Sequence, residues 1–182
     1  MRTGHNLVAS VFMGCHAMYR ARGPEEMRPV GETEFVAGIA AASDSGSYGA
    51  TRVAAGDRSA SADLTLGDRV EPVLGTLIRA GGGRFRGVRH SAAWDASDVI
   101  GNSAEPPRPT PLPRRRLARR AGAADPARTL ARRLGLHPQL GDIVDLARAC
   151  PEARIVVGHV GGPLGYGPYT GKRDEVVRWK AG

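Results

Sequence analysis

A histidine directly follows a short apolar run near the C-terminal end of the chain. Ile155, Val156 and Val157 predict a buried strand, because apolar and β-branched residues favour that setting. The strand gives way at Gly158 and His159 to a loop rich in glycine and proline. In parallel α/β folds, ligands gather where strands end, so His159 is predicted to lie at a functional site. The competing interpretation is a histidine that only caps this loop through a backbone hydrogen bond.

Other polar side chains also follow predicted strands. Arg89 and His90 end one such strand. Tyr19 and Arg20 come after another. A guanidinium holds a carboxylate through two parallel hydrogen bonds, so Arg89 is a candidate for binding a ligand carboxylate. The competing interpretations are a solvated strand end for Arg89 and His90, and core packing for Tyr19.

Strands and helices alternate along the sequence and would position these side chains. Apolar runs predict strands over residues 6–14, 50–56, 84–90 and 155–158. Apolar residues at helical spacing predict helices over residues 31–44, 68–80 and 143–149. The first of these helices carries acidic residues in its first turn, where the helix dipole favours them. Such alternation is typical of βαβ units, so we predict an α/β fold with a parallel sheet.

The positive charge of the chain is concentrated in one segment. The 182 residues have a formal net charge of +8, yet residues 104–135 alone contain nine arginines and only two acidic residues. This segment is rich in arginine, proline and alanine and poor in large apolar residues. An arginine-rich segment of this kind could bind nucleic acid or another polyanion. The segment has no aromatic residues for base stacking and no recognised binding motif, so we favour a small-molecule ligand.

Cysteine content and hydropathy bear on the compartment. Cys15 and Cys150 are the two cysteines, far apart and without metal-ligand spacing. No apolar run is long enough to cross a bilayer, and the first residues lack the pattern of a signal peptide. These features predict a cytoplasmic protein with free thiols.

Several segments together resemble one known family. They are GHNLVASVFMGCHAMYR, RPVGETEFVAGIAA, ADLTLGDRVEPVL, GRFRGVRHSAAWD, HPQLGDIVDLARACPEARIVVGHVGGPLG and GPYTGKRDEV. In this order and spacing they are similar to the amidohydrolase-related family, whose members include the 2-pyrone-4,6-dicarboxylate lactonases. The resemblance implies a (β/α)8 TIM barrel, of which this chain matches roughly strands two to six. We therefore expect residues 1–182 to form a single, partial barrel domain.

The resemblance also implies a function and a set of site residues. It aligns His159 and His137 with histidines at the ends of the sixth and fifth strands. Neutral imidazoles there bind a divalent metal such as zinc, or polarise a substrate carbonyl without a metal. Arg89, His90, Tyr19 and Arg20 would line the same mouth and hold the substrate. The implied reaction is hydrolysis at the carbonyl of a carboxylate-bearing, lactone or amide substrate.

The sequence also departs from the family pattern. The family has an H-x-H motif after its first strand and an aspartate after its last; this sequence has no H-x-H and ends before the aspartate. A strand is expected before His137, where the chain carries Arg132, Arg133 and Leu134. We hypothesise that residues 104–135, and the shorter stretch 57–61, are translated in a shifted reading frame. We accordingly expect an impaired or inactive fragment, with an irregular or disordered segment over 104–135.

Overall fold

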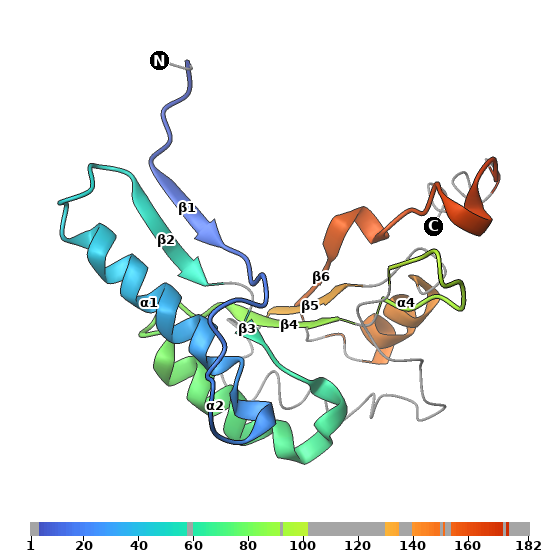
Figure 1. The fold of residues 1–182 in the computed structure, drawn as a ribbon, viewed down its shortest axis with the longest axis horizontal. Helices are drawn as coiled ribbons and strands as arrows, with labels where there is room; N and C mark the ends of the chain where they lie inside the picture. The colour runs from blue at the N-terminus through green and yellow to red at the C-terminus, as the bar shows by residue number, and fades with distance from the viewer. Residues whose placement is uncertain are drawn as a thin grey trace.

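All of the paired strands run parallel, with helices packed beside them (Figure 1). The computed structural model describes residues 4–57, 60–91, 93–101, 130–134, 140–149, 151, 154–172 and 174. The strands are β1 (Ala9–Phe12), β2 (Arg52–Asp57), β3 (Ala60–Ser61), β4 (Gly87–Ser91), β5 (Leu130–Leu134) and β6 (Arg154–Val157). The α-helices are α1 (Val30–Asp44), α2 (Val70–Ala80) and α4 (Leu140–Ala149). Short 3-10 helices are η1 (Glu25–Met27), η2 (Leu64–Arg69), η4 (Gly158–Gly161) and η5 (Gly167–Tyr169).

The strands are neighbours in the order in which they occur along the chain. β1 pairs with β2 in one sheet, and β3, β4, β5 and β6 follow one another in a second. Only residues 58–59 separate β2 from β3, so the last strand of the first sheet is followed almost directly by the first strand of the second. The prediction of a parallel α/β fold is therefore confirmed. The described strands do not close into a barrel, because β1 and β6 are each paired on one side only.

The core lies between the strands and the helices α1 and α2. Apolar residues of α2 recur three and four positions apart and are buried: Val70, Val73, Leu74 and Leu77. They pack with residues of neighbouring elements that include Val30, Leu64, Phe85 and Val88. A smaller cluster joins α1 to the first sheet through Val36, Ala40 and Ala54. This spacing follows the 3.6-residue helical repeat, which explains why the helices were predicted correctly.

One prediction about the strands is wrong. Residues 104–135 were expected to form an irregular or disordered segment. Within that segment, Leu130–Leu134 forms β5 and pairs in register with both β4 and β6. Arginine is not excluded from strands when two neighbouring strands supply the backbone hydrogen bonds. Residues 104–129 and His137 lie outside the described part of the chain.

Candidate functional site at the carboxyl ends of the strands

Arg89 lies on the face of β4 that turns away from α2, which we call the inner face. Successive residues of a strand point to opposite faces. Val88 is fully buried in the core with Leu77 of α2, so the next residue, Arg89, points the other way. Its Nη1 donates a hydrogen bond of 2.6 Å to the carbonyl oxygen of Gly14, in the loop after β1. Arg89 therefore joins the carboxyl ends of two strands.

Tyr19 comes from the loop after β1 and completes a small polar cluster with Arg89. Ser61, at the end of β3, is the register partner of Arg89 and shares its face. Burial raises the pKa of Tyr19, and the approach of the Ser61 side chain offsets part of that rise. The negative charge of Glu32 raises this pKa as well, whereas the Arg89 guanidinium lowers it. Residues from β3, β4, α1 and the loop after β1 thus meet around one phenol.

From the raised pKa of Tyr19 we predict how its phenol titrates at high pH. Folded Tyr19 holds its proton more tightly than the unfolded chain does, so it stabilises the fold below its ordinary pKa of about 10. That contribution is lost as the pH rises through the folded value. We expect Tyr19→Phe to remove one phenolate transition above pH ~10 from the ultraviolet absorbance titration. Tyr48→Phe serves as the control, because Tyr48 is 81% exposed. A Tyr19 transition at the ordinary tyrosine pKa of about 10 would contradict the described burial.

The loop after β1 is held by a buried carboxylate that the sequence did not single out as a site residue. Glu32, in the first turn of α1, is only 1% exposed. Its Oε1 accepts hydrogen bonds from the backbone N–H groups of Cys15 at 2.9 Å and Ala17 at 3.0 Å. The thiol of Cys15 also approaches Oε1, at 3.5 Å. The sequence offered one signal, an acid in the first turn of a helix, but the loop that it binds is distant in the chain.

Two other predicted substrate-binding residues already have protein partners. His90 lies on the same face of β4 as Val88, and its Nδ1 accepts a hydrogen bond of 3.4 Å from the backbone N–H of Leu64. Arg20 pairs with Glu34: its Nε donates to Oε2 at 3.0 Å, and its Nη2 donates to Oε1. This pairing lowers the pKa of Glu34. The structure therefore groups Tyr19 with Arg89, but places His90 on the opposite face of β4 and occupies the guanidinium of Arg20.

His159 follows β6, as predicted, in an exposed and unusual turn. Both His159 and Val160 have left-handed backbone conformations, with φ of 50° and 56°. Such conformations cost roughly 1–2 kcal/mol per residue for side chains with a Cβ. The carbonyl oxygen of His159 accepts a hydrogen bond of 2.9 Å from the N–H of Gly162. This hydrogen bond involves the backbone of His159 and not its imidazole. It therefore does not show that the side chain caps the loop.

The predicted metal ligands do not form a site within the described residues. The part of the chain that the structure describes contains no group of three His, Cys, Asp or Glu side chains that could hold a metal ion. His137, the second predicted ligand, lies outside that part. The arginines between positions 104 and 129, on which the polyanion-binding alternative depends, also lie outside it. Both hypotheses stay predictions.

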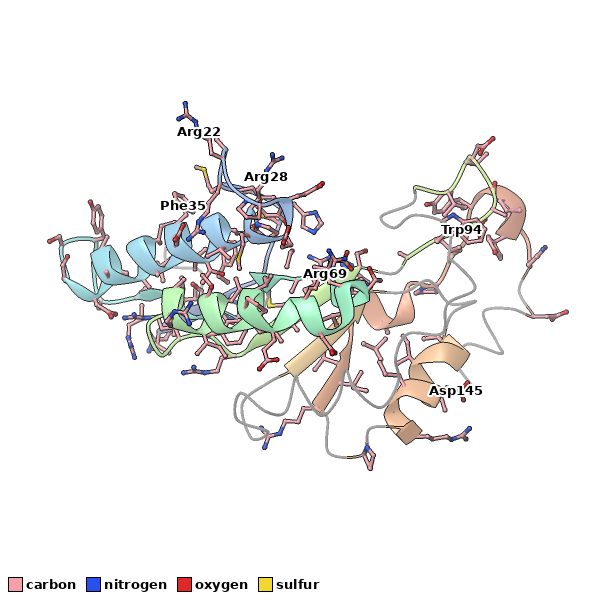
Figure 2. The ribbon with its side chains drawn as sticks, turned by 90° about the horizontal axis from the view of Figure 1, so that it is seen from below. Arg22, Arg28, Phe35, Arg69, Trp94 and Asp145 are labelled. Atoms are coloured by element: carbon pink, nitrogen blue, oxygen red, sulfur yellow. The ribbon has the colours of Figure 1, made fainter. Side chains whose placement is uncertain are left out.

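A second polar contact at this end of the sheet was also missed. The hydroxyl of Tyr169, in η5, donates a hydrogen bond of 2.6 Å to Oδ2 of Asp95, in the loop after β4. The Nζ of Lys172 lies 5.3 Å from the centre of the Tyr169 ring. Figure 2 shows the neighbouring Trp94 in this loop, beside the C-terminal segment and far from α1 and α2. Tyr169 and Asp95 lie 74 residues apart along the chain, so no local sequence pattern relates them.

Comparison with known proteins identifies the family of this chain. A family model described as amidohydrolase matches residues 11–180, nearly the whole chain. The chain belongs to the amidohydrolase family. No curated protein and no solved structure matches it. The resemblance that the sequence suggested is thereby confirmed at the level of the family.

Membership of the amidohydrolase family gives the strand-end cluster a context. The family supports a general hydrolase function, and its members commonly use divalent metals. The family also implies a TIM barrel, in which active sites lie at the carboxyl ends of the strands. Arg89 and His159 lie at that end of the second sheet, and Tyr19 follows β1 of the first. None of the described helices is long and apolar enough to cross a membrane.

Proposed function

We propose that this amidohydrolase binds a small molecule carrying a carboxylate next to a lactone or amide carbonyl, through the inner face of its sheet. The observation that carries the proposal is the position of Arg89. Its guanidinium lies on the inner face, at the carboxyl end of β4, and is anchored to the loop after β1. Charged groups at this end of a parallel sheet are typical of ligand sites.

Arg89 and Tyr19 would bind different groups of the ligand. A guanidinium has five N–H donors, so the bond to Gly14 leaves others for a ligand carboxylate. Tyr19 is partly buried, and its phenol is protonated at neutral pH because its pKa is raised above an ordinary value of about 10 that already lies well above 7. A neutral phenol can donate a hydrogen bond to a carbonyl oxygen on which negative charge develops during hydrolysis. His159, after β6, is the proposed second group that polarises this carbonyl.

We also propose that hydrolysis by this chain is slow. A general base must lie within hydrogen-bond reach of the attacking water. Two carboxylates near the strand ends already accept hydrogen bonds from the protein: Glu32 of α1 from Cys15 and Ala17, and Asp95 of the loop after β4 from Tyr169. Asp63 likewise accepts from the backbone N–H of Thr65 at 2.8 Å. These contacts favour structural roles for the three carboxylates.

A divalent metal does not fit the described residues as they stand. Zinc sites use three or four protein ligands, and the described part of the chain offers no group of three. His137 and His159 keep their proposed role as a ligand pair, or as imidazoles that act without a metal.

The strand order supports the proposal of a partial barrel. In a (β/α)8 barrel each strand lies beside the next one along the chain, and all are parallel. The described strands have this arrangement when β2 and β3 count as one strand interrupted at residues 58–59. We propose that they correspond to strands two to six of the family barrel, with α1 and α2 on the outer side.

Turnover tests the proposed function. We expect 2-pyrone-4,6-dicarboxylate, a lactone with two carboxylates, to be hydrolysed about 10²- to 10⁴-fold more slowly than by an amidohydrolase with an unbonded general base, because that is the usual contribution of such a base. The rate is measured by ultraviolet absorbance, with and without added zinc. Turnover equal to that of such an enzyme would contradict the proposal that the three carboxylates are structural.

A further inference from the structure

Glu32 is the most deeply buried charged residue of the described structure and has no part in the proposed chemistry. It is 1% exposed, and its Oε2 is buried without a hydrogen-bond partner among the described residues. Its Oε1 has three donors, the N–H groups of Cys15 and Ala17 and the thiol of Cys15. Burying a carboxylate in this way is costly unless the hydrogen bonds that it makes serve the structure or the function.

The three donors come from one short loop with an unusual backbone. His16, between Cys15 and Ala17, has φ of 63°, and Met18 has φ of 54°. Backbone N–H groups that converge on one anion form a nest, a common way to bind negative charge. The carboxylate of Glu32 fills this nest. It therefore stabilises a loop conformation that non-glycine residues rarely adopt.

The same loop packs closely against the first turn of α1. A Cβ added to Gly31 would come within 2.4 Å of the carbonyl oxygen of Met18 and 2.6 Å of the N–H nitrogen of Arg20. Such distances are shorter than real contacts, so only glycine fits at this position. Gly31 permits the close approach, and Glu32 supplies the hydrogen bonds that hold it.

This loop also carries two groups of the proposed site. Gly14, whose carbonyl oxygen accepts the hydrogen bond from Arg89, precedes Cys15 directly. Tyr19 follows two residues after Ala17, and the charge of Glu32 reaches its phenol. A loop that changed conformation at residues 15–17 would therefore displace the anchor of Arg89 and the Tyr19 ring together.

We propose that Glu32 is a positioning residue for ligand binding: its carboxylate holds the loop after β1 so that Gly14 anchors Arg89 and Tyr19 lies beside it. Glu32 does not touch the ligand in this account. The inference rests on the proposed function for its effect on binding, whereas its effect on Arg89 can be measured without a ligand.

The experiment compares Glu32→Ala, Glu32→Gln and Glu32→Asp with the control Glu25→Gln. Glu25 is an exposed acid in η1, so the control removes the same charge without breaking the Arg20–Glu34 ion pair. Two properties are measured in the full chain. One is the hydrogen exchange of the Cys15 and Ala17 amides together with the ¹⁵N shifts of the Arg89 guanidinium. The other is the Kd of 2-pyrone-4,6-dicarboxylate.

We expect Glu32→Ala to speed exchange of both amides at least tenfold, to shift the Arg89 signals and to raise Kd at least tenfold. Glu32→Gln keeps an oxygen acceptor and is expected to restore most of the amide protection and to stay within about threefold of the wild-type Kd. Glu32→Asp keeps the charge but is one methylene shorter, so it is expected to fall between them. If Glu32→Ala does not fold, Glu32→Gln and Glu32→Asp give the same comparison.

The outcomes separate positioning from a purely structural role. Faster amide exchange with unchanged Arg89 signals and unchanged Kd would overturn the proposal. Equal effects of Glu25→Gln would overturn it too, because they would assign the change to net charge. If the wild-type chain does not bind the probe, the proposed function fails, and the Arg89 signals still decide the inference: a shift in Glu32→Ala alone supports it, and no shift overturns it.

Discussion

Replacing Arg89 with alanine is expected to weaken binding of 2-pyrone-4,6-dicarboxylate by roughly 10- to 100-fold. A net loss equal to one hydrogen bond between charged groups costs about 1.5–3 kcal/mol, which corresponds to this fold-change in Kd. Arg89→Lys keeps the charge but loses the planar pair of donors, so it is expected to fall between wild type and Arg89→Ala. Isothermal titration calorimetry measures the three dissociation constants.

Arg86→Ala is the matched control for this experiment. Arg86 lies just before β4, and its Nη1 donates to the carbonyl oxygens of Gly83 and Phe85, at 2.6 and 2.9 Å. It therefore belongs to the amino end of the strand, far from the proposed site, and its loss changes the net charge equally. We expect Kd to stay within about twofold in this control, since a distant exposed charge contributes little. A similar loss of affinity in both variants would mean that only the overall positive charge attracts the ligand.

Replacing Leu77 with alanine is expected to have the largest effect on stability. Leu77 is 0% exposed and lies in the cluster that joins α2 to β4. Truncation of a buried leucine leaves a cavity that costs about 2–5 kcal/mol. The free energy of unfolding is measured by urea denaturation monitored by circular dichroism.

Ile39→Ala provides the comparison for Leu77→Ala. It removes a side chain of the same size from α1, where Ile39 is 37% exposed. Less burial means less transfer free energy and little cavity, so we expect a loss below about 1 kcal/mol. Equal losses in the two variants would contradict the described core between α2 and β4.

The sequence predicted those features that depend on local pattern. The helices α1 and α2 follow from apolar residues at helical spacing, and β6 follows from its short apolar run. Arg89 and Tyr19 were expected together because both follow predicted strands, and parallel strands end at the same edge of a sheet. In the structure β1 and β4 belong to separate sheets, and the loop after β1 brings Tyr19 toward Arg89.

The features that the sequence did not predict depend on contacts between distant parts of the chain. β5 has a sequence with two arginines and little strand propensity, and it forms between two neighbours that supply its hydrogen bonds. The partners of Glu32 lie 15 and 17 residues away, and Tyr169 lies 74 residues from Asp95. The orientation of His90 could have been predicted, because it shares the strand parity of the apolar Val88.

The most direct test of the central claim compares a ligand with and without its negative charge. The account holds that the inner face of the sheet binds carboxylates through Arg89. Titration of the wild-type chain should therefore show 2-pyrone-4,6-dicarboxylate binding at least tenfold more tightly than its dimethyl ester, and Arg89→Ala should abolish that difference. Equal affinity of the wild-type chain for the acid and the ester would contradict the account.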